Sequence, residues 1–286
     1  MAKIEHHPTG HTWALVLGAS SGFGAACAHE LAKVGYNIFG VHLDRQATMP
    51  EVNKIIHTIK HHGSEAVFFN INAADPIKRN ETLDEIEEQF QKTPQAEVRI
   101  LFHSLAFGTL RAFIGKKEEE SITKSQMEMT MDVMAHSLVY WTQGLISRKL
   151  MKNGGRIFAM TSEGGQHVLP YYGAVSAAKS ALESHIRQLA LELGPRNITA
   201  NAILAGVTDT PALRKIPGAV NMIRIAQKKN PFNRITTPDD VAKMVVLLAQ
   251  EGAGFLSGNV IGVDGAESKI SYVGQINPYE YEDLQG

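Results

Sequence analysis

The chain has 286 residues and a formal net charge of -1, and 44% of its residues are hydrophobic. This length and hydrophobic content are enough for one sizeable core, so we expect a single domain over residues 1–286. The near-zero charge argues against a general nucleic-acid binder, and no apolar run reaches membrane-spanning length.

The single cysteine and the polar N-terminus favour a cytoplasmic protein. Cys27 cannot form an internal disulfide, which suits a reducing compartment. Residues 1–11 lack the apolar core of a signal peptide. The histidine pairs His6-His7 and His61-His62 have no partners at metal-ligand spacing, so no metal site is predicted.

The first element is an apolar run, Trp13–Leu17, followed by the turn Gly18-Ala-Ser-Ser-Gly22-Phe-Gly24 and a helical pattern over Ala25–Val34. Glycines in such a turn let the backbone approach a pyrophosphate, which the following helix N-terminus stabilises. The spacing G-x-x-x-G-x-G differs from the G-x-G-x-x-G fingerprint and is also compatible with an ordinary loop. The flanking strand and helix favour a dinucleotide site.

The second predicted strand, Tyr36–Leu43, ends where such a site contacts the adenosine ribose. An acidic residue there suits the free 2′-hydroxyl of NAD(H), and an arginine suits the 2′-phosphate of NADP(H). Asp44 favours the first cofactor, whereas Arg45 and a protonated His42 favour the second. We predict NADP(H) over NAD(H).

Two further strands end in small or polar residues. Ala66–Ile71 leads to Asn72-Ala-Ala-Asp75, which either hydrogen-bonds adenine or forms an Asx turn before Pro76. Val98–Phe102 leads to His103-Ser-Leu-Ala-Phe-Gly108, which is small and apolar enough for a cofactor to pass over it.

Strands and helices alternate along the whole chain, which predicts an α/β fold with a doubly wound, Rossmann-type parallel sheet of about seven strands. The remaining predicted strands are Arg156–Met160, Asn197–Leu204 and Val260–Val263. The remaining predicted helices are Glu51–His62, Ile77–Gln91, Gln126–Met151, Gly173–Leu191 and Pro238–Gln250. Ligands bind beyond the carboxyl ends of such strands, where Gly18, Ser104, Ser162 and Gly206 all fall.

The stretch from Ser162 to Lys179 carries the candidate chemistry. A strand end delivers the Ser162 hydroxyl, and the next helix delivers the Tyr172 phenol and the Lys179 ammonium. A fixed cation favours the ionised form of a phenol, so Lys179 is expected to lower the pKa of Tyr172 and to make it a proton donor or oxyanion partner near neutral pH. The spacing alone is equally compatible with surface tyrosines and a solvated lysine.

These motifs together resemble the short-chain dehydrogenase/reductase family over about Thr12–Lys269. The glycine turn, Ser162, Lys179 and Val263-Asp264-Gly265 carry the resemblance. The usual catalytic tyrosine stands four residues before the lysine, but Val175 takes that place here. His103-Ser104 replaces the usual Asn-Asn, and Met134 replaces the usual asparagine of the next helix. All three departures are similar to enoyl-acyl carrier protein reductases, and the ordinary glycine turn is similar to their NADPH-dependent branch.

The resemblance implies reduction of trans-2-enoyl thioesters by NAD(P)H in fatty acid synthesis, with a homotetrameric assembly. It implies Tyr172, Lys179 and Ser162 as catalytic residues, and Phe107, Tyr171 and Tyr172 as substrate residues. Relatives often carry an aromatic residue where this chain has Ser162. The implied cofactor-binding residues are Gly18, Ser20, Ser21, Gly22, Phe23, Gly24, His42, Arg45, Asn72, Ala73, Ser104, Leu105, Lys179, Gly206, Val207 and Thr210.

A segment around residues 207–234 is predicted to be a mobile substrate lid. It is rich in basic residues that suit either an acidic carrier protein or a solvated surface: Arg214, Lys215, Arg224, Lys228 and Lys229. Two other functions remain open. A carbonyl or hydroxysteroid-type reductase would need Tyr172 or Tyr171 to reach a carbonyl, and a nucleotide-sensing binding protein would bind the cofactor without turnover.

Overall fold

The computed structural model describes residues 10–271. Its centre is a sheet of seven parallel strands in the order β3-β2-β1-β4-β5-β6-β7. The strands are β1 (Thr12–Leu17), β2 (Asn37–His42), β3 (Ala66–Asn70), β4 (Glu97–His103), β5 (Arg156–Ser162), β6 (Thr199–Ala205) and β7 (Val260–Val263). Strand order reverses between β1 and β4, so the loops after these two strands diverge and leave room for a ligand.

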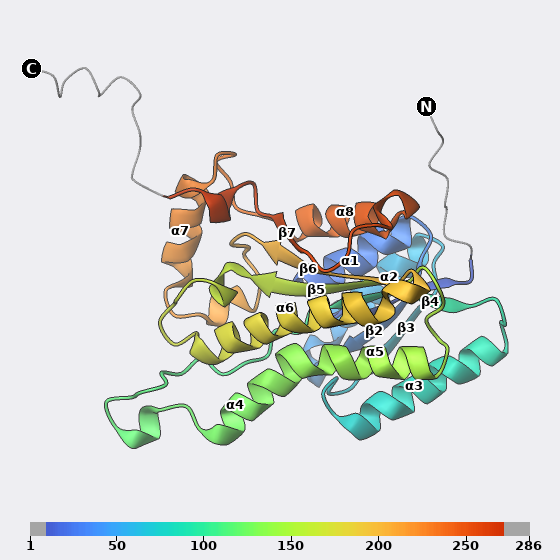
Figure 1. Cartoon of the computed structure of the whole chain (residues 1–286), viewed down its shortest axis with the longest axis horizontal. Helices are drawn as coiled ribbons and strands as arrows, with labels where there is room; N and C mark the ends of the chain where they lie inside the picture. Colours follow the sequence, from blue (N-terminus) through green and yellow to red (C-terminus); the bar gives the residue numbers. More distant parts are fainter. Residues whose placement is uncertain (1–9, 272–286) are drawn as a thin grey trace, which may run out of the picture.

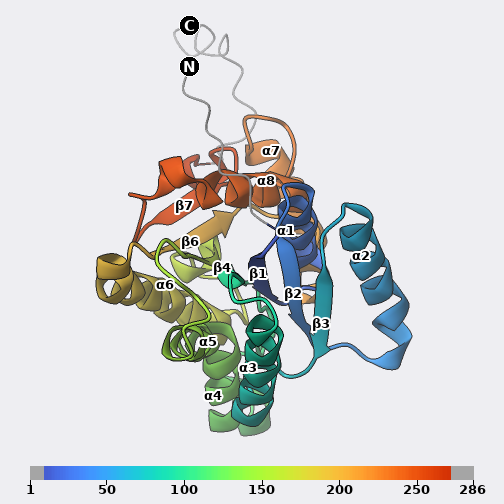
Figure 2. The same cartoon turned by 90° about the vertical axis from the view of Figure 1, so that its right-hand side faces the viewer.

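Helices cover both faces of the sheet (Figures 1 and 2). They are α1 (Gly22–Lys33), α2 (Met49–His61), α3 (Pro76–Gln91), α4 (Lys124–Met131), α5 (Ser137–Ser147), α6 (Gly173–Leu193), α7 (Ala219–Lys229) and α8 (Pro238–Ala249). A π-helical turn, η3 (Asp132–His136), joins α4 to α5. In the described part of the chain, no helix is long and apolar enough to cross a bilayer.

Two hydrophobic cores form, one on each face of the sheet. The first buries apolar side chains of α3, α5 and α6, and the second buries those of α1, α2 and α8. Most strands are buried on both faces, which is why they are nearly continuous apolar runs rather than alternating ones. The predicted single-domain, doubly wound fold is confirmed.

The seven predicted strands are all present, although several predicted bounds shift by a few residues, and in two elements the backbone shows why. The strand expected from Asn197 begins at Thr199 because Asn197 adopts a left-handed conformation with φ 54°. The helix expected over Gln126–Met151 starts two residues earlier, where Thr123 and Gln126 form a capping box, and contains the π-helical turn η3. Its last helical residue is Ser147, because Lys149 has a positive φ. The signal-peptide interpretation of residues 1–11 and the pair His6-His7 rest mainly on residues outside the described range.

Candidate active site

The turn after β1 is shaped to hold a phosphate group. Gly18 has φ +90°, and a Cβ on it would lie 2.7 Å from the Ser104 carbonyl oxygen, across the switch point of the sheet. Gly22 also has a positive φ, of +53°. Ser21 precedes α1 without capping it by its side chain, so the first-turn amides of α1 face the cavity without a side-chain partner. These features fit the pyrophosphate of a dinucleotide.

Gly24 has a different role from the one predicted. It does not line the cavity, because it packs α1 against the turn. A Cβ at this position would overlap the Gly18 carbonyl oxygen and lie 2.8 Å from the carbonyl carbon. Gly24 therefore sets the distance between helix and turn, and its contact with a cofactor stays a prediction.

The end of β2 holds Asp44 through several hydrogen bonds. His42 Nδ1 lies 3.1 Å from Asp44 Oδ2, and Thr48 Oγ1 donates to Asp44 Oδ1 at 2.8 Å. Burial works to raise the pKa of Asp44, but hydrogen bonds with Ser20, Thr48 and His42 hold it below its usual value. Arg45 is exposed and forms no ion pair with any described residue.

A cavity of about 1110 Å³ runs along the carboxyl ends of the strands. All three predicted catalytic residues lie on its wall, and so do Phe107 and every predicted cofactor-binding residue except Gly24. Asn72 is on the wall and also forms the alternative Asx turn, since its Oδ1 accepts from the Ala74 amide at 3.0 Å. Tyr171 is not part of the wall: it is 51% exposed and has φ 65°.

Tyr172 stands at the start of α6, where it is the N-cap residue and only 9% exposed. Its hydroxyl lies 3.3 Å from Ser162 Oγ, at the end of β5. Among the described residues, Tyr172 is the one tyrosine on the cavity wall. Strand and helix thus bring a phenol and a hydroxyl into hydrogen-bond distance.

Lys179 lies two turns further along α6 and is 5% exposed. Its ammonium donates to the Met160 carbonyl oxygen at 2.7 Å. Burial lowers the pKa of Lys179 to about 8, against the opposing effect of Glu183. His103 is fully buried nearby, and burial together with the Lys179 charge lowers its pKa to about 3, so its imidazole is neutral.

The expected lowering of the Tyr172 pKa is wrong for this structure. Burial raises the pKa of Tyr172 above 10, and the hydrogen bond with Ser162 opposes this only in part. The reason is that Tyr172 is almost enclosed, while the Lys179 ammonium is directed at the backbone of β5. A phenol with a raised pKa carries its proton at neutral pH, but it is a weaker acid than an unperturbed phenol.

Val175 occupies the place of the usual tyrosine and is buried, with 4% of its surface exposed. Both Val175 Cγ2 and Met134 Sδ lie 2.8 Å from the point that a Cβ on Gly108 would occupy, and Thr130 Cγ2 lies 2.9 Å from it. The two departures at positions 134 and 175 are therefore neighbours around one glycine. A larger side chain at position 175 would have to displace neighbours, because Val175 is buried.

Several residues of the site were not predicted. The cavity lining includes the apolar residues Met129, Val133, Leu169, Ile216 and Met222. Glu183 and Glu267 are buried acids, each hydrogen-bonded to a segment that lines the cavity. The helical spacing of Lys179 and Glu183 was a signal available in the sequence, whereas the position of Glu267 depends on the folding of a distant loop.

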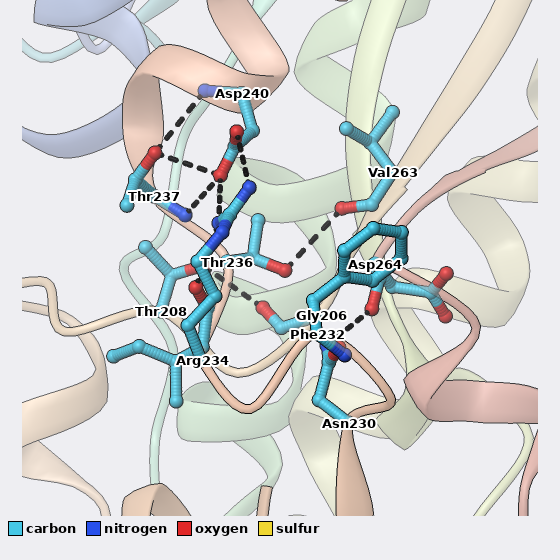
Figure 3. Close-up of polar contacts among 11 residues, drawn as sticks. Gly206, Thr208, Asn230, Phe232, Arg234, Thr236, Thr237, Asp240, Val263 and Asp264 are labelled. Atoms are coloured by element: carbon cyan, nitrogen blue, oxygen red, sulfur yellow. Dashed lines mark hydrogen bonds and ion pairs between the residues drawn. The ribbon is translucent and has the colours of Figure 1, made fainter. Parts of the chain in front are cut away.

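The predicted lid contains α7 and is fastened at both ends (Figure 3). At one end, the Val207 amide donates to Glu267 Oε1 at 3.1 Å, and Thr208 Oγ1 donates locally to the Gly206 carbonyl oxygen at 2.9 Å. At the other end, Asn230 Nδ2 donates to the Asp264 carbonyl oxygen at 2.8 Å, and Arg234 donates to both carboxylate oxygens of Asp240. Between these ends, Met222 of α7 lines the cavity. Lys229, the last residue of α7, has its Nζ 3.5 Å from Glu163 Oε1.

The sequence profile described as enoyl-(acyl carrier protein) reductase matches residues 18–266 of this chain. The chain belongs to this family. Among its relatives is an enoyl-[acyl-carrier-protein] reductase [NADH] of Synechocystis, 34% identical over 173 residues, a match that spans 60% of this chain and 66% of the relative. That alignment thus covers just under two thirds of the relative's length.

The chain is also similar to members of the wider short-chain dehydrogenase/reductase superfamily that have other activities. A probable tetrahydroxynaphthalene reductase of Zymoseptoria tritici is 27% identical over 270 residues, which are 88% of this chain and 93% of the relative. The crystal structure of the angucycline C-6 ketoreductase LanV with bound NADP superposes with a TM-score of 0.77 and 25% identity, covering 91% of this chain and 96% of that chain. The superfamily and a nicotinamide cofactor are thereby supported.

Proposed function

We propose that this protein reduces trans-2-enoyl thioesters, with a bound reduced nicotinamide supplying the hydride. The observation that carries the proposal is the position of the phenol: Tyr172 is on the cavity wall, and the place four residues before Lys179 is a buried valine. The apolar part of the cavity lining, which includes Met129, Leu169 and Met222, suits an acyl chain. The family match over residues 18–266 agrees with this reading.

The shifted phenol suits an enoyl substrate for a geometric reason. A ketone takes hydride at the carbonyl carbon and the proton on the adjacent oxygen. An enoyl thioester takes hydride at C3, while negative charge develops on the thioester oxygen, two carbons further along. A proton donor moved by three residues is displaced by about 4.5 Å along a helix axis, in keeping with that longer separation.

In this proposal, each polar residue has a separate task. Tyr172, which carries its proton at neutral pH, donates a hydrogen bond and then its proton to the enolate oxygen. Ser162 orients the Tyr172 hydroxyl at 3.3 Å. Lys179 holds the ribose hydroxyls of the cofactor through its ammonium group. Neutral His103 adds no second positive charge beside Lys179.

A carbonyl reductase is the second candidate, because Ser162 lies within hydrogen-bond distance of Tyr172. The similarity of this chain to the structure of the ketoreductase LanV agrees with this alternative. An acyl carrier protein as substrate carrier is supported by the exposed Arg224 and Lys228 on α7. Two other basic residues expected to contribute are paired instead, Arg214 with Asp209 and Lys229 with Glu163.

The proposal predicts oxidation of NADPH or NADH, followed at the reduced-nicotinamide absorbance band, when a trans-2-enoyl thioester is added to the purified protein. A 3-ketoacyl thioester of the same chain length is the matched control and should give a rate at least about tenfold lower, equivalent to 1.4 kcal/mol. Turnover of the ketone alone would contradict the proposal and favour the carbonyl reductase. Cofactor binding with neither reaction would favour a nucleotide sensor.

We infer that the preferred cofactor is NADP(H), because Asp44 is already held by His42 and Thr48 while Arg45 is exposed without an ion-pair partner among the described residues. Arg45→Ala is therefore expected to weaken NADPH binding by about 1.5–3 kcal/mol, roughly tenfold or more in Kd, and to leave NADH binding nearly unchanged. Fluorescence titration with each cofactor measures both values. Lys54→Ala, an exposed lysine on α2, is the control; equal losses for both cofactors in Arg45→Ala would contradict the inference.

A further inference from the structure

The ammonium of Lys179 is a buried charge in the site. Only 5% of the Lys179 surface is exposed, and its ammonium group donates to the Met160 carbonyl oxygen at 2.7 Å. Burial alone favours the neutral amine of a lysine. An amine without its charge is a weaker donor to a cofactor hydroxyl than an ammonium ion. Something in the protein must therefore oppose the loss of the proton.

Glu183 lies one helical turn after Lys179 on α6 and is only 7% exposed. Its Oε1 accepts a hydrogen bond from Thr161 Oγ1 at 2.6 Å. Thr161 stands between Met160, whose carbonyl receives the Lys179 ammonium, and Ser162, whose hydroxyl approaches Tyr172. The Glu183 carboxyl group thus lies one helical turn from Lys179, and both side chains are hydrogen-bonded to the end of β5.

We propose that Glu183 is a positioning residue, whose negative charge keeps the buried Lys179 ammonium protonated and therefore able to bind the cofactor. This inference rests on the cofactor role of Lys179 in the proposed function. Buried carboxylates are costly unless they are paired. The hydrogen bond from Thr161 gives the carboxylate a direct partner, and the Lys179 charge acts on it from one helical turn away without a direct ion pair.

The other titratable groups around Lys179 do not supply the compensating charge. His103, from β4, is neutral, and a charge on it would repel the ammonium. Tyr172, at the start of α6, retains its proton because burial raises its pKa. Glu163, from the turn after β5, lies 3.4 Å from His167 and 3.5 Å from Lys229, so its charge is shared with other partners. Glu183 is the carboxylate that raises the pKa of Lys179.

Glu183→Gln tests this role because glutamine keeps the shape and an oxygen that accepts from Thr161, but removes the charge. The measurement is Kd for the reduced nicotinamide by fluorescence titration between about pH 6 and pH 9. The ratio of the variant's Kd to that of the wild type should be near one at about pH 6. It should rise toward roughly tenfold above about pH 8.5 if the pKa of Lys179 falls by about one. The Kd ratio rises with pH because the ammonium form of Lys179 binds the cofactor, and Lys179 loses its proton at a lower pH in the variant than in the wild type.

Two further variants separate charge from structure. Thr161→Val removes the hydrogen bond and keeps the charge, so its Kd ratio to wild type should not change with pH. Glu192→Gln removes an exposed charge from the same helix and should leave both Kd and its pH dependence unchanged. A pH-independent ratio for Glu183→Gln, or a ratio for Thr161→Val that rises with pH, would overturn the proposal. Because the assay needs no turnover, a rising ratio in Glu183→Gln without enoyl reduction would contradict the proposed function and leave the role of Glu183 standing.

Discussion

Replacing Tyr172 by phenylalanine is expected to lower kcat for a trans-2-enoyl thioester by about 10²–10⁴-fold, the usual contribution of a positioned proton donor. The ring, which is buried at the start of α6, is retained, so folding and cofactor binding should change little. Steady-state kinetics at saturating cofactor, together with a fluorescence titration of the cofactor, measure the two effects separately.

The control for this substitution is Tyr140→Phe, which removes a phenol from α5, outside the cavity. It retains the ring that lies 5.2 Å from the Arg79 guanidinium carbon. It should leave kcat within about twofold, because surface substitutions away from a site usually change stability by no more than about 0.5 kcal/mol. If Tyr172→Phe kept more than about half of the wild-type kcat, Tyr172 would not be the proton donor.

The largest structural effect is expected from Gly24→Ala. The new methyl group would overlap the backbone carbonyl of Gly18, and neither the helix nor the turn can yield without moving the cofactor site. We expect the free energy of unfolding to fall by about 1–3 kcal/mol. The affinity for the nicotinamide cofactor should fall as well, because the turn that lines the cavity is displaced. Thermal unfolding with and without cofactor measures both effects.

Gly194→Ala provides the matched control, because a Cβ at that position meets no atom within 4 Å and the backbone is helical, with φ -52° and ψ -43°. There the substitution should stabilise the protein by about 0.4–1 kcal/mol, since it restricts the unfolded chain. A Gly24→Ala variant as stable as Gly194→Ala, and with unchanged cofactor affinity, would show that α1 can move away from the turn at no cost.

The sequence predicted the sheet well because each strand is a short apolar run bounded by glycine or polar residues. The predicted bounds of β7, Val260–Val263, coincide with the observed ones. The carboxyl ends of the strands were predicted to meet at one edge, and Gly18, Ser104, Ser162 and Gly206 do line one cavity. These predictions depend on local patterns and on the parallel topology, both of which the sequence specifies.

The features that were missed depend on tertiary packing. Helix α7 was missed, although it lies inside the segment predicted as a mobile lid. Pro217-Gly218 obscured the amphipathic pattern that begins at Ala219. The pKa of Tyr172 was predicted in the wrong direction, since the degree of enclosure of a side chain is not visible in residue spacing. The burial of Glu183 was likewise hidden, because a charged residue at helical spacing is usually solvated.

The shared contact of Val175 and Met134 around Gly108 restricts how this enzyme and the ordinary ketone reductases can interconvert by mutation. A tyrosine at position 175 needs more volume than the space beside Met134 and Gly108 provides. An asparagine at position 134 alone places a polar group near the buried Val175. We therefore expect each single replacement to be unfavourable while the other residue is unchanged, which would make the two positions epistatic. A laboratory route between the two reaction types should succeed sooner with paired libraries at positions 134 and 175 than with stepwise selection.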